Sequence, residues 1–261
     1  MKSVFISADD LGRSEDRNSA IIESFKKGYI KSAGLIVTGC YLQDAINKIN
    51  SSGYIKCVHC HFNLSGNILG DNSHDIPLTP RIANDQSFCV KGQFIPYTTL
   101  PNRPKDVFKW WAVYKELCAQ YNKFLEVTSC KGNLRHIDFH LWYNLTWPVS
   151  IALNLFTWTH RIKTVRYIGV HLEKSRRRLF RILAWNPFVK SYRSSNIDCF
   201  LTHPEWFNKD SKLELYCHPD YLDGQLFDNS ISYFGHDKRT MREHVELLKQ
   251  HDLEFMSWRD V

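Results

Sequence analysis

Five side chains that can bind a metal ion or transfer a proton stand at the ends of apolar, strand-like runs of the sequence. They are Asp9, Asp10, His61, His140 and His218. Two adjacent carboxylates where a buried strand becomes a loop are suited to a metal site or an acid/base pair. A turn that caps a helix explains Asp9, Asp10 and Gly12 as well. The recurrence of polar groups at strand ends favours a metal or acid/base site over a capping turn, because the active site of an α/β barrel is built from such positions.

The two-residue period of a strand shows which polar groups share a face. In the run from Arg135 to His140, Ile137 and Phe139 alternate with three polar side chains, which are His136, Asp138 and His140. Only one face can be the apolar layer beneath the helices, so we expect the polar face to line the barrel. The same alternation places Glu214 on the face of His218, which either reaches the rim of the barrel or belongs to a turn.

The segment Cys57-Val58-His59-Cys60-His61 contains a Cys-x-x-Cys spacing that can indicate a zinc or redox motif. In a strand, however, Cys57 and Cys60 point to opposite faces and cannot share a metal ion. His61 is therefore the metal-ligand candidate of this run. His59 is either a second polar group inside the barrel or a hydrogen-bonded core histidine.

The alternation of strand-like and helical segments predicts an α/β fold. Strand-like runs cover residues 2–8, 33–39, 55–62, 135–140, 164–169, 197–203, 212–218 and 254–258. Helical patterns follow Ser14, cover residues 104–125 and include Met241, Val245 and Leu248. Strands that alternate with helices form parallel sheets, and this number of strands indicates a distorted or incomplete (β/α) TIM-like barrel. The length of 261 residues fits a single domain, residues 1–261.

A long segment after the third strand, residues 65–102, interrupts the alternation of strands and helices. It is rich in Gly, Pro, Asn, Asp and Ser and shows no sustained period. A connection of that length is normally a lid, a binding loop or an oligomer contact. Because it follows His61 directly, we expect a lid or insertion loop over the site.

Composition and charge indicate where the protein is located and which kinds of partner it has. The chain has eight cysteines and begins without a signal-like apolar stretch, so we expect reduced thiols and a cytoplasmic protein. Residues 139–160 lack Asp, Glu, Lys and Arg, but Asn144, Pro148 and Asn154 favour a strand end, a loop and a core helix over a membrane span. Much of the formal charge of +7 lies between Lys174 and Arg193, and we expect no nucleic-acid partner.

Six blocks of the sequence occur in the same order in a known protein family. They are Ala8-Asp9-Asp10-Leu11-Gly12, His61-Phe62-Asn63-Leu64-Ser65, His136-Ile137-Asp138-Phe139-His140, Val165-Arg166, Glu214-Leu215-Tyr216-Cys217-His218-Pro219 and Ser257-Trp258-Arg259-Asp260. With these blocks the chain resembles the YdjC/ChbG-type carbohydrate deacetylases, which are relatives in fold of the polysaccharide deacetylases. The resemblance covers nearly the whole chain.

The resemblance implies metal-dependent hydrolysis of the N-acetyl group of an amino sugar. Asp10, His61 and His140 are then expected to hold one divalent ion, Zn²⁺ or Mg²⁺, whose bound water attacks the amide. Asp9 would accept the proton of that water, and His218 would protonate the departing amine.

Further residues are expected to bind the substrate or to support the ligands. We assign Trp142, Asn144 and Arg166 to substrate binding, and Asp138 and Glu214 to support of the metal ligands. Trp142 and Asn144 stand where the family commonly has further histidines, and Asp220 stands where glycine commonly follows His-Pro. We expect these differences from the family pattern to affect which substrate is preferred. Trp142 can stack on a sugar face or fill the base of the following helix.

The basic segment from Lys174 to Trp185 is compatible with more than one kind of partner. Its cationic side chains lie beside an apolar stripe, which suits a phosphate-bearing or lipid-linked sugar, peripheral contact with an anionic membrane, or a solvated helix. A homodimer is also compatible with the sequence.

Two other functions stay open, namely a glycoside hydrolase that uses Asp9 and Asp10 without a metal, and a non-catalytic carbohydrate-binding relative.

Overall fold

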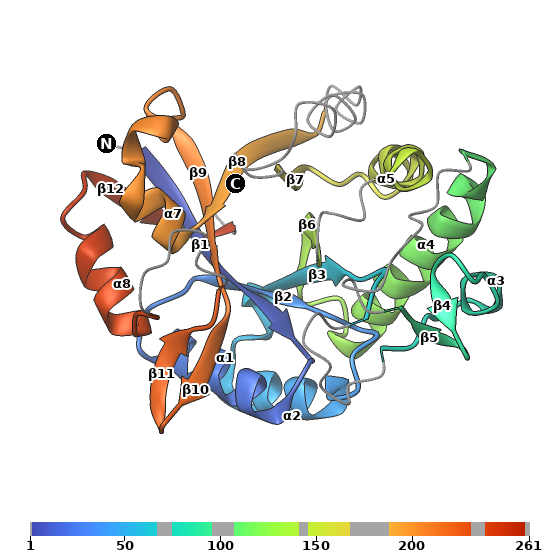
Figure 1. The fold of residues 1–261 in the computed structure, drawn as a ribbon, viewed down its shortest axis with the longest axis horizontal. Helices are drawn as coiled ribbons and strands as arrows, with labels where there is room; N and C mark the ends of the chain where they lie inside the picture. The colour runs from blue at the N-terminus through green and yellow to red at the C-terminus, as the bar shows by residue number, and fades with distance from the viewer. Residues whose placement is uncertain are drawn as a thin grey trace.

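The central feature of the fold is a closed barrel of parallel strands with helices around it (Figure 1). The computed structural model describes residues 2–66, 75–95, 107–140, 146–167, 188–230 and 238–258. The strands of the ring are β1 (Lys2–Leu11), β2 (Ser32–Leu35), β3 (Val58–Phe62), β6 (Asn133–Phe139), β7 (Thr164–Tyr167), β8 (Lys190–Asn196) and β9 (Lys212–Cys217). Because β9 pairs with β1, the ring is closed, and the predicted TIM-like α/β barrel is confirmed.

The first strand is paired along its whole length. On one edge, Ser3–Ala8 pair with β9. On the other edge, the first half of β1 pairs with β12 (Leu253–Met256) and the second half pairs with β2. The carboxyl end of β1, which carries Asp9 and Asp10, is thereby fixed within the ring.

The helices and two small hairpins surround the barrel (Figure 1). The helices are α1 (Glu15–Lys26), α2 (Leu42–Ser52), α3 (Pro80–Ala83), α4 (Trp110–Val127), α5 (Trp147–Thr159), α7 (Ile197–Thr202) and α8 (Met241–Leu248), with short 3-10 turns η1 (Ile55–Cys57), η3 (Val107–Lys109) and η5 (Pro204–Phe207). The hairpins are β4 (Cys89–Val90) with β5 (Gln93–Phe94) and β10 (Pro219–Leu222) with β11 (Gln225–Asp228). Among the described residues, none of these helices combines the length and apolarity needed to cross a bilayer.

The predicted helical patterns correspond to observed helices. Ser14 caps α1 by accepting a hydrogen bond from the backbone N–H of Arg17, and the buried Ile21 and Phe25 face the core. The described part of α4 begins at Trp110, later than the predicted start at residue 104, and α5 is the core helix expected within residues 139–160. The apolar spacing of these helices is explained by their contact with the outer face of the strands.

One predicted strand is wrong. Residues 197–203 were expected to be a strand, but Ile197–Thr202 form α7 and the strand is β8, residues 190–196. The side chain of Asn196 accepts a hydrogen bond from the backbone N–H of Cys199, 2.7 Å away, and so caps the helix. The apolar residues of this run are buried at helical spacing, with Ile197 and Phe200 three positions apart.

Of the predicted loop 65–102, residues 65–66 and 75–95 are described, and residues 75–95 contain α3 and the β4–β5 hairpin. Glu116 of α4 is buried and accepts hydrogen bonds from the backbone N–H groups of Leu78 and Thr79 at 2.9 and 2.8 Å. This part of the segment is therefore attached to α4. Its action as a lid stays a prediction.

His244 of α8 is buried between two carboxylates. Its Nε2 lies 3.1 Å from Asp198 Oδ1, and its Nδ1 lies 3.4 Å from Asp228 Oδ2. Burial lowers the pKa of this imidazole, but the hydrogen bonds and charges of Asp198 and Asp228 outweigh burial and raise the pKa to about 9. The charged imidazole links α8 to α7 and β11.

This link predicts a pH-dependent contribution to stability. Because the folded pKa of His244 exceeds the ordinary value of 6.5, its contribution is complete below pH 6.5 and is lost as the pH rises through about 9. Between pH 6 and pH 10, urea unfolding should show that the wild type loses roughly 3 kcal/mol more than His244→Gln. His203→Gln, at a partly exposed position, is the control. Equal losses in the wild type and His244→Gln would refute the assignment.

Candidate metal centre

Both adjacent aspartates reach the interior of the barrel because β1 is irregular where they occur. Asp10 has a left-handed backbone with φ 70°, and the register between β1 and β2 shifts between Ala8 and Leu11. Neighbours in a regular strand point to opposite faces, whereas a bulge can turn both to one side. Aspartate tolerates the left-handed region better than most residues. As a result, Asp9 and Asp10 are only 5% and 4% exposed at the same strand end.

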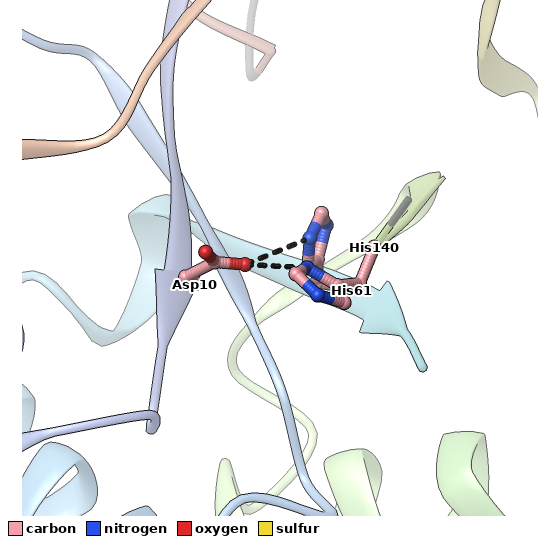
Figure 2. A group of neighbouring side chains, drawn as sticks. All are labelled: Asp10, His61 and His140. Carbon is pink, nitrogen blue, oxygen red and sulfur yellow. Dashed lines mark ion pairs between the residues drawn. The ribbon is translucent and has the colours of Figure 1, made fainter. Parts of the chain in front are cut away.

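Asp10, His61 and His140 converge from the ends of β1, β3 and β6, with their side chains pointing toward one another (Figure 2). His140 Nδ1 lies 2.7 Å and His61 Nε2 3.6 Å from Asp10 Oδ1. One ligand atom from each residue lies within 4.8 Å of the other two. Asp10 Oδ1 and His61 Nε2 are buried, and neither has a well-aligned hydrogen-bond partner among the described residues. Such atoms, in a set of one carboxylate and two imidazoles, fit a divalent cation.

Asp138 of β6 fixes the orientation of the His61 ring. Its Oδ1 lies 2.5 Å from His61 Nδ1, and its Oδ2 lies 3.0 Å from His59 Nε2. Burial raises the pKa of Asp138, but Arg166 and His61 outweigh burial and hold that pKa well below its usual value. An ionised carboxylate accepts the Nδ1–H of His61, which leaves Nε2 directed at Asp10. Asp138 thus lies behind His61, and its role in supporting a metal ligand stays a prediction.

The guanidinium of Arg166, on β7, lies among three carboxylates and is 2% exposed. Its Nη1 and Nη2 contact the two oxygens of Asp9 at 2.5 and 2.8 Å. Its Nε donates to Glu214 at 2.7 Å, and its Nη2 lies 2.6 Å from Asp138. The sequence assigned Arg166 to substrate binding. The structure instead surrounds it with acidic side chains, where it holds Asp9.

Two further groups of side chains have the composition of a metal site. They are His59, His136 and Asp138, and Asp9, His61 and Asp138. Both oxygens of Asp138 already contact histidine or Arg166, and both oxygens of Asp9 contact Arg166. The group of Asp10, His61 and His140 is therefore the favoured metal centre.

His218 follows β9 and faces the same cluster. Its Nε2 lies 4.0 Å from Asp9 Oδ2 and 4.0 Å from Asp10 Oδ2, and its side chain is 24% exposed. Its Nδ1 lies 3.0 Å from Ser230 Oγ, which donates to Asp228 at 2.6 Å. Burial raises the pKa of Asp228, but His244 outweighs burial and lowers the pKa to about 2. Because the one hydroxyl proton of Ser230 goes to this ionised carboxylate, Ser230 accepts the Nδ1–H of His218, and Nε2 faces the site.

Two arginines beside the cluster were missed by sequence reasoning. Arg17 of α1 contacts Asp10 Oδ2 and Asp220 Oδ2, each at 2.8 Å, so Asp220 is linked to Asp10. Arg13, in the turn before α1, lies with Nη1 2.6 Å from His140 Nε2. Arginines near the start of a helix resemble an ordinary solvated turn in sequence. The only signal was their spacing of three and seven residues from Asp10.

Some expected site residues cannot be placed. Trp142, Asn144 and the basic segment from Lys174 to Trp185 lie outside the described residues. The eight cysteines are free thiols, and Cys60 is buried on the core side of β3, as the strand period predicts.

Gly34 of β2 provides space for the His61 ring. A Cβ at this position would lie 2.9 Å from His61 Nδ1. Gly34→Ala should therefore tilt the ring and weaken metal binding about tenfold without removing a ligand, as loss of a supporting contact does. Competition with a chromophoric chelator would measure this affinity. Gly53→Ala is the control for loss of stability alone, because a Cβ there meets nothing within 4 Å but strains the left-handed backbone at φ 79°, away from the cluster. Unchanged affinity in Gly34→Ala would contradict the geometry.

Comparison with known proteins identifies relatives of this chain. Residues 3–258 match the sequence model of the YdjC-like protein family. Over 143 residues the chain is 32% identical to a carbohydrate deacetylase of Vibrio parahaemolyticus serotype O3:K6 (strain RIMD 2210633); the match covers 54% of this chain and 49% of that protein, about half of its length. A solved structure from Enterococcus faecalis V583, provisionally described as a cellobiose-phosphate cleavage protein, has a TM-score of 0.70 and 19% identity over 99% of this chain and 98% of that chain. This likeness concerns the fold.

Proposed function

The chain belongs to the YdjC-like protein family, and on this basis we propose that it is a metal-dependent carbohydrate deacetylase, which hydrolyses the N-acetyl group of an amino sugar. The observation that carries the proposal is the convergence of Asp10, His61 and His140 beside Asp9 and His218. The relative named carbohydrate deacetylase supports the reaction class.

The metal ion would be held by Asp10 Oδ1, His61 Nε2 and one nitrogen of His140. When bound, such an ion polarises the amide carbonyl and lowers the pKa of a water molecule toward neutrality. Three protein ligands leave positions for water and substrate, as a catalytic site requires. Two imidazoles favour Zn²⁺, while Mg²⁺ stays the alternative.

Asp9 is the proton acceptor in this proposal. Its carboxylate is buried beside Asp10, and Arg166 contacts both of its oxygens. A carboxylate held at two points keeps one orientation, which general-base catalysis needs. Arg166 is then a positioning residue, and the sugar is bound by other groups.

His218 is the proton donor to the departing amine. Its Nδ1–H is fixed by Ser230, so proton transfer takes place at Nε2, on the side of Asp9 and Asp10. Its partial exposure leaves room for a substrate at that nitrogen. The proposed proton acceptor and proton donor thus lie beside the same cluster, and each is oriented by a different residue. Arg166 orients Asp9, and Ser230 orients His218.

The glycoside hydrolase alternative fits these contacts less well. A glycosidase needs one carboxylic acid whose pKa is raised, so that it can protonate the leaving group. Burial raises the pKa of Asp10, but His140, His61 and Arg13 outweigh burial and hold it well below the usual value. Asp9 is bound by Arg166 on both oxygens. Asp10 therefore does not suit the acid of that mechanism, and the contacts of Arg166 leave Asp9 poorly placed to reach a leaving group.

We also propose finer features that rest on the sequence. The cationic segment from Lys174 to Arg181 favours a phosphate-bearing or lipid-linked amino sugar, with Trp142 and Asn144 in contact with it. Residues 65–102 would act as a lid, and the free thiols suit a cytoplasmic location. Peripheral membrane contact and a homodimer stay predictions.

Asp9→Asn should separate catalysis from metal binding. It removes the proton acceptor and keeps the ligand set, so metal content should stay complete while turnover falls by about 10² to 10⁴. Acetate release from N-acetylated sugars and elemental analysis would measure both. Asp16→Asn, an exposed change on α1, should leave both unaffected. Normal turnover in Asp9→Asn would reject Asp9 as the base.

His61→Ala should instead remove metal and activity together, because one of three ligands is lost. Elemental analysis after dialysis and acetate release are the measurements, and His203→Ala is the matched control away from the cluster. A full metal complement with normal turnover in His61→Ala would show that the centre is assigned wrongly.

A further inference from the structure

Asp228 holds the backbone of His218 as well as the hydroxyl that orients its ring. Its Oδ1 accepts the backbone N–H of His218 at 2.8 Å and the backbone N–H of Ser230 at 3.0 Å, in addition to the hydroxyl of Ser230. Asp228 also pairs with Pro219 across the β10–β11 hairpin, directly after His218. Three donors on one oxygen fix the carboxylate and the turn beside it. The orientation of the proposed proton donor therefore depends on Asp228.

The other oxygen of Asp228 faces His244 of α8, which packs beside the hairpin (Figure 1). His244 Nδ1 lies 3.4 Å from Asp228 Oδ2, as a contact between charges that is not a well-aligned hydrogen bond. Within the described ranges, His244 is the one ion-pair partner of Asp228. Both side chains are buried, and an ionised carboxylate needs a compensating cation there. The imidazolium of His244 supplies that charge.

The opposite side of the His244 ring contacts a carboxylate that has a cation of its own. His244 Nε2 donates to Asp198 Oδ1 at 3.1 Å, and the same oxygen accepts from Arg239 Nη1 at 2.7 Å. Arg239 compensates Asp198, which leaves the charge of His244 to Asp228. Facing His244 are thus Asp228 from β11 and Asp198 from α7, with Arg239 before α8 and Glu243 in the capping box of α8.

We propose that His244 is a positioning residue of the proton donor, because its charge keeps Asp228 ionised and in place, and Asp228 in turn orients His218. This inference rests on the role of His218 in the proposed function. After donation from Nε2, the His218 ring keeps its proton on Nδ1, which is the form that Ser230 accepts. Without the cation, Asp228 takes up a proton and becomes a weaker acceptor, so it no longer holds the hydroxyl of Ser230. The neutral His218 ring is then free to carry its proton on either nitrogen.

The tautomer of His218 gives a test that needs no turnover. In proton–nitrogen NMR spectra at about pH 8, with the signal assigned through His218→Gln, the wild type should carry the proton on Nδ1. His244→Gln keeps a side chain of similar shape without the charge and should show both tautomers. Asp198→Asn is the matched control, because it removes the other carboxylate beside His244 and should keep the wild-type tautomer. A pure Nδ1–H form in His244→Gln, or equal mixing in Asp198→Asn, overturns the proposal.

The wild type offers a second measurement that does not depend on the folding of a variant. Burial lowers the pKa of His244, but Asp198 and Asp228 outweigh burial and raise it to about 9. The charge of His244 is therefore present at pH 8 and is mostly lost by pH 10. The tautomers of His218 should mix over this range, as His244 loses its proton. A His218 tautomer that stays unchanged to pH 10 contradicts the proposal.

Turnover distinguishes failure of this inference from failure of the proposed function. In acetate release, kcat of His244→Gln should fall about tenfold to a hundredfold, the range for loss of one charged contact, with KM and metal content unchanged. Asp198→Asn should stay near the wild type, and an equal fall in both variants would indicate a purely structural role and overturn the proposal. Normal turnover in His218→Gln rejects the proton donor of the proposed function. Loss of turnover in His218→Gln without any loss in His244→Gln rejects this inference alone.

Discussion

One buried guanidinium allows the interior of this barrel to be acidic. Arg166 contacts Asp9, Asp138 and Glu214, which would otherwise repel one another where water cannot screen them. The ionised Asp138 orients His61, and Asp9, the proposed proton acceptor, is fixed by the contacts of Arg166 with both of its oxygens. The geometry of the proposed ligands and the position of the proposed base therefore depend on the same cation.

The sequence predicted the polar lining of the barrel well, because burial leaves a strand only one polar face. His59 and His61 on β3, and Asp138 on β6, meet as the two-residue period indicates. The orientation of Asp9 and Asp10 could not be predicted in the same way. Regular alternation separates adjacent residues, and only the left-handed backbone at Asp10 brings both inside. That conformation depends on the pairing of β1 with its neighbours.

The arginines were harder to predict than the acids and histidines. Arg166 stands in a strand-like run whose partners come from β1, β6 and β9, so its contacts follow from barrel closure and not from spacing along the chain. Arg13 and Arg17 belong to a helix start with an ordinary composition. The run 197–203 shows the opposite difficulty, because a short apolar stretch fits a strand or a helix until the cap at Asn196 is recognised.

The pairing of β1 also determines when the site can form in a new chain. Phe5 pairs with Glu214 on one edge and with Met256 on the other, so both of its partners are made by the ribosome more than two hundred residues later. Until then the strand that carries the two aspartates has open edges, which in a nascent chain invite aggregation or chaperone binding. The cluster around Asp10 is therefore assembled only after β9 and β12 have been synthesised, and a truncated product that lacks β9 has the aspartates without the complete ring.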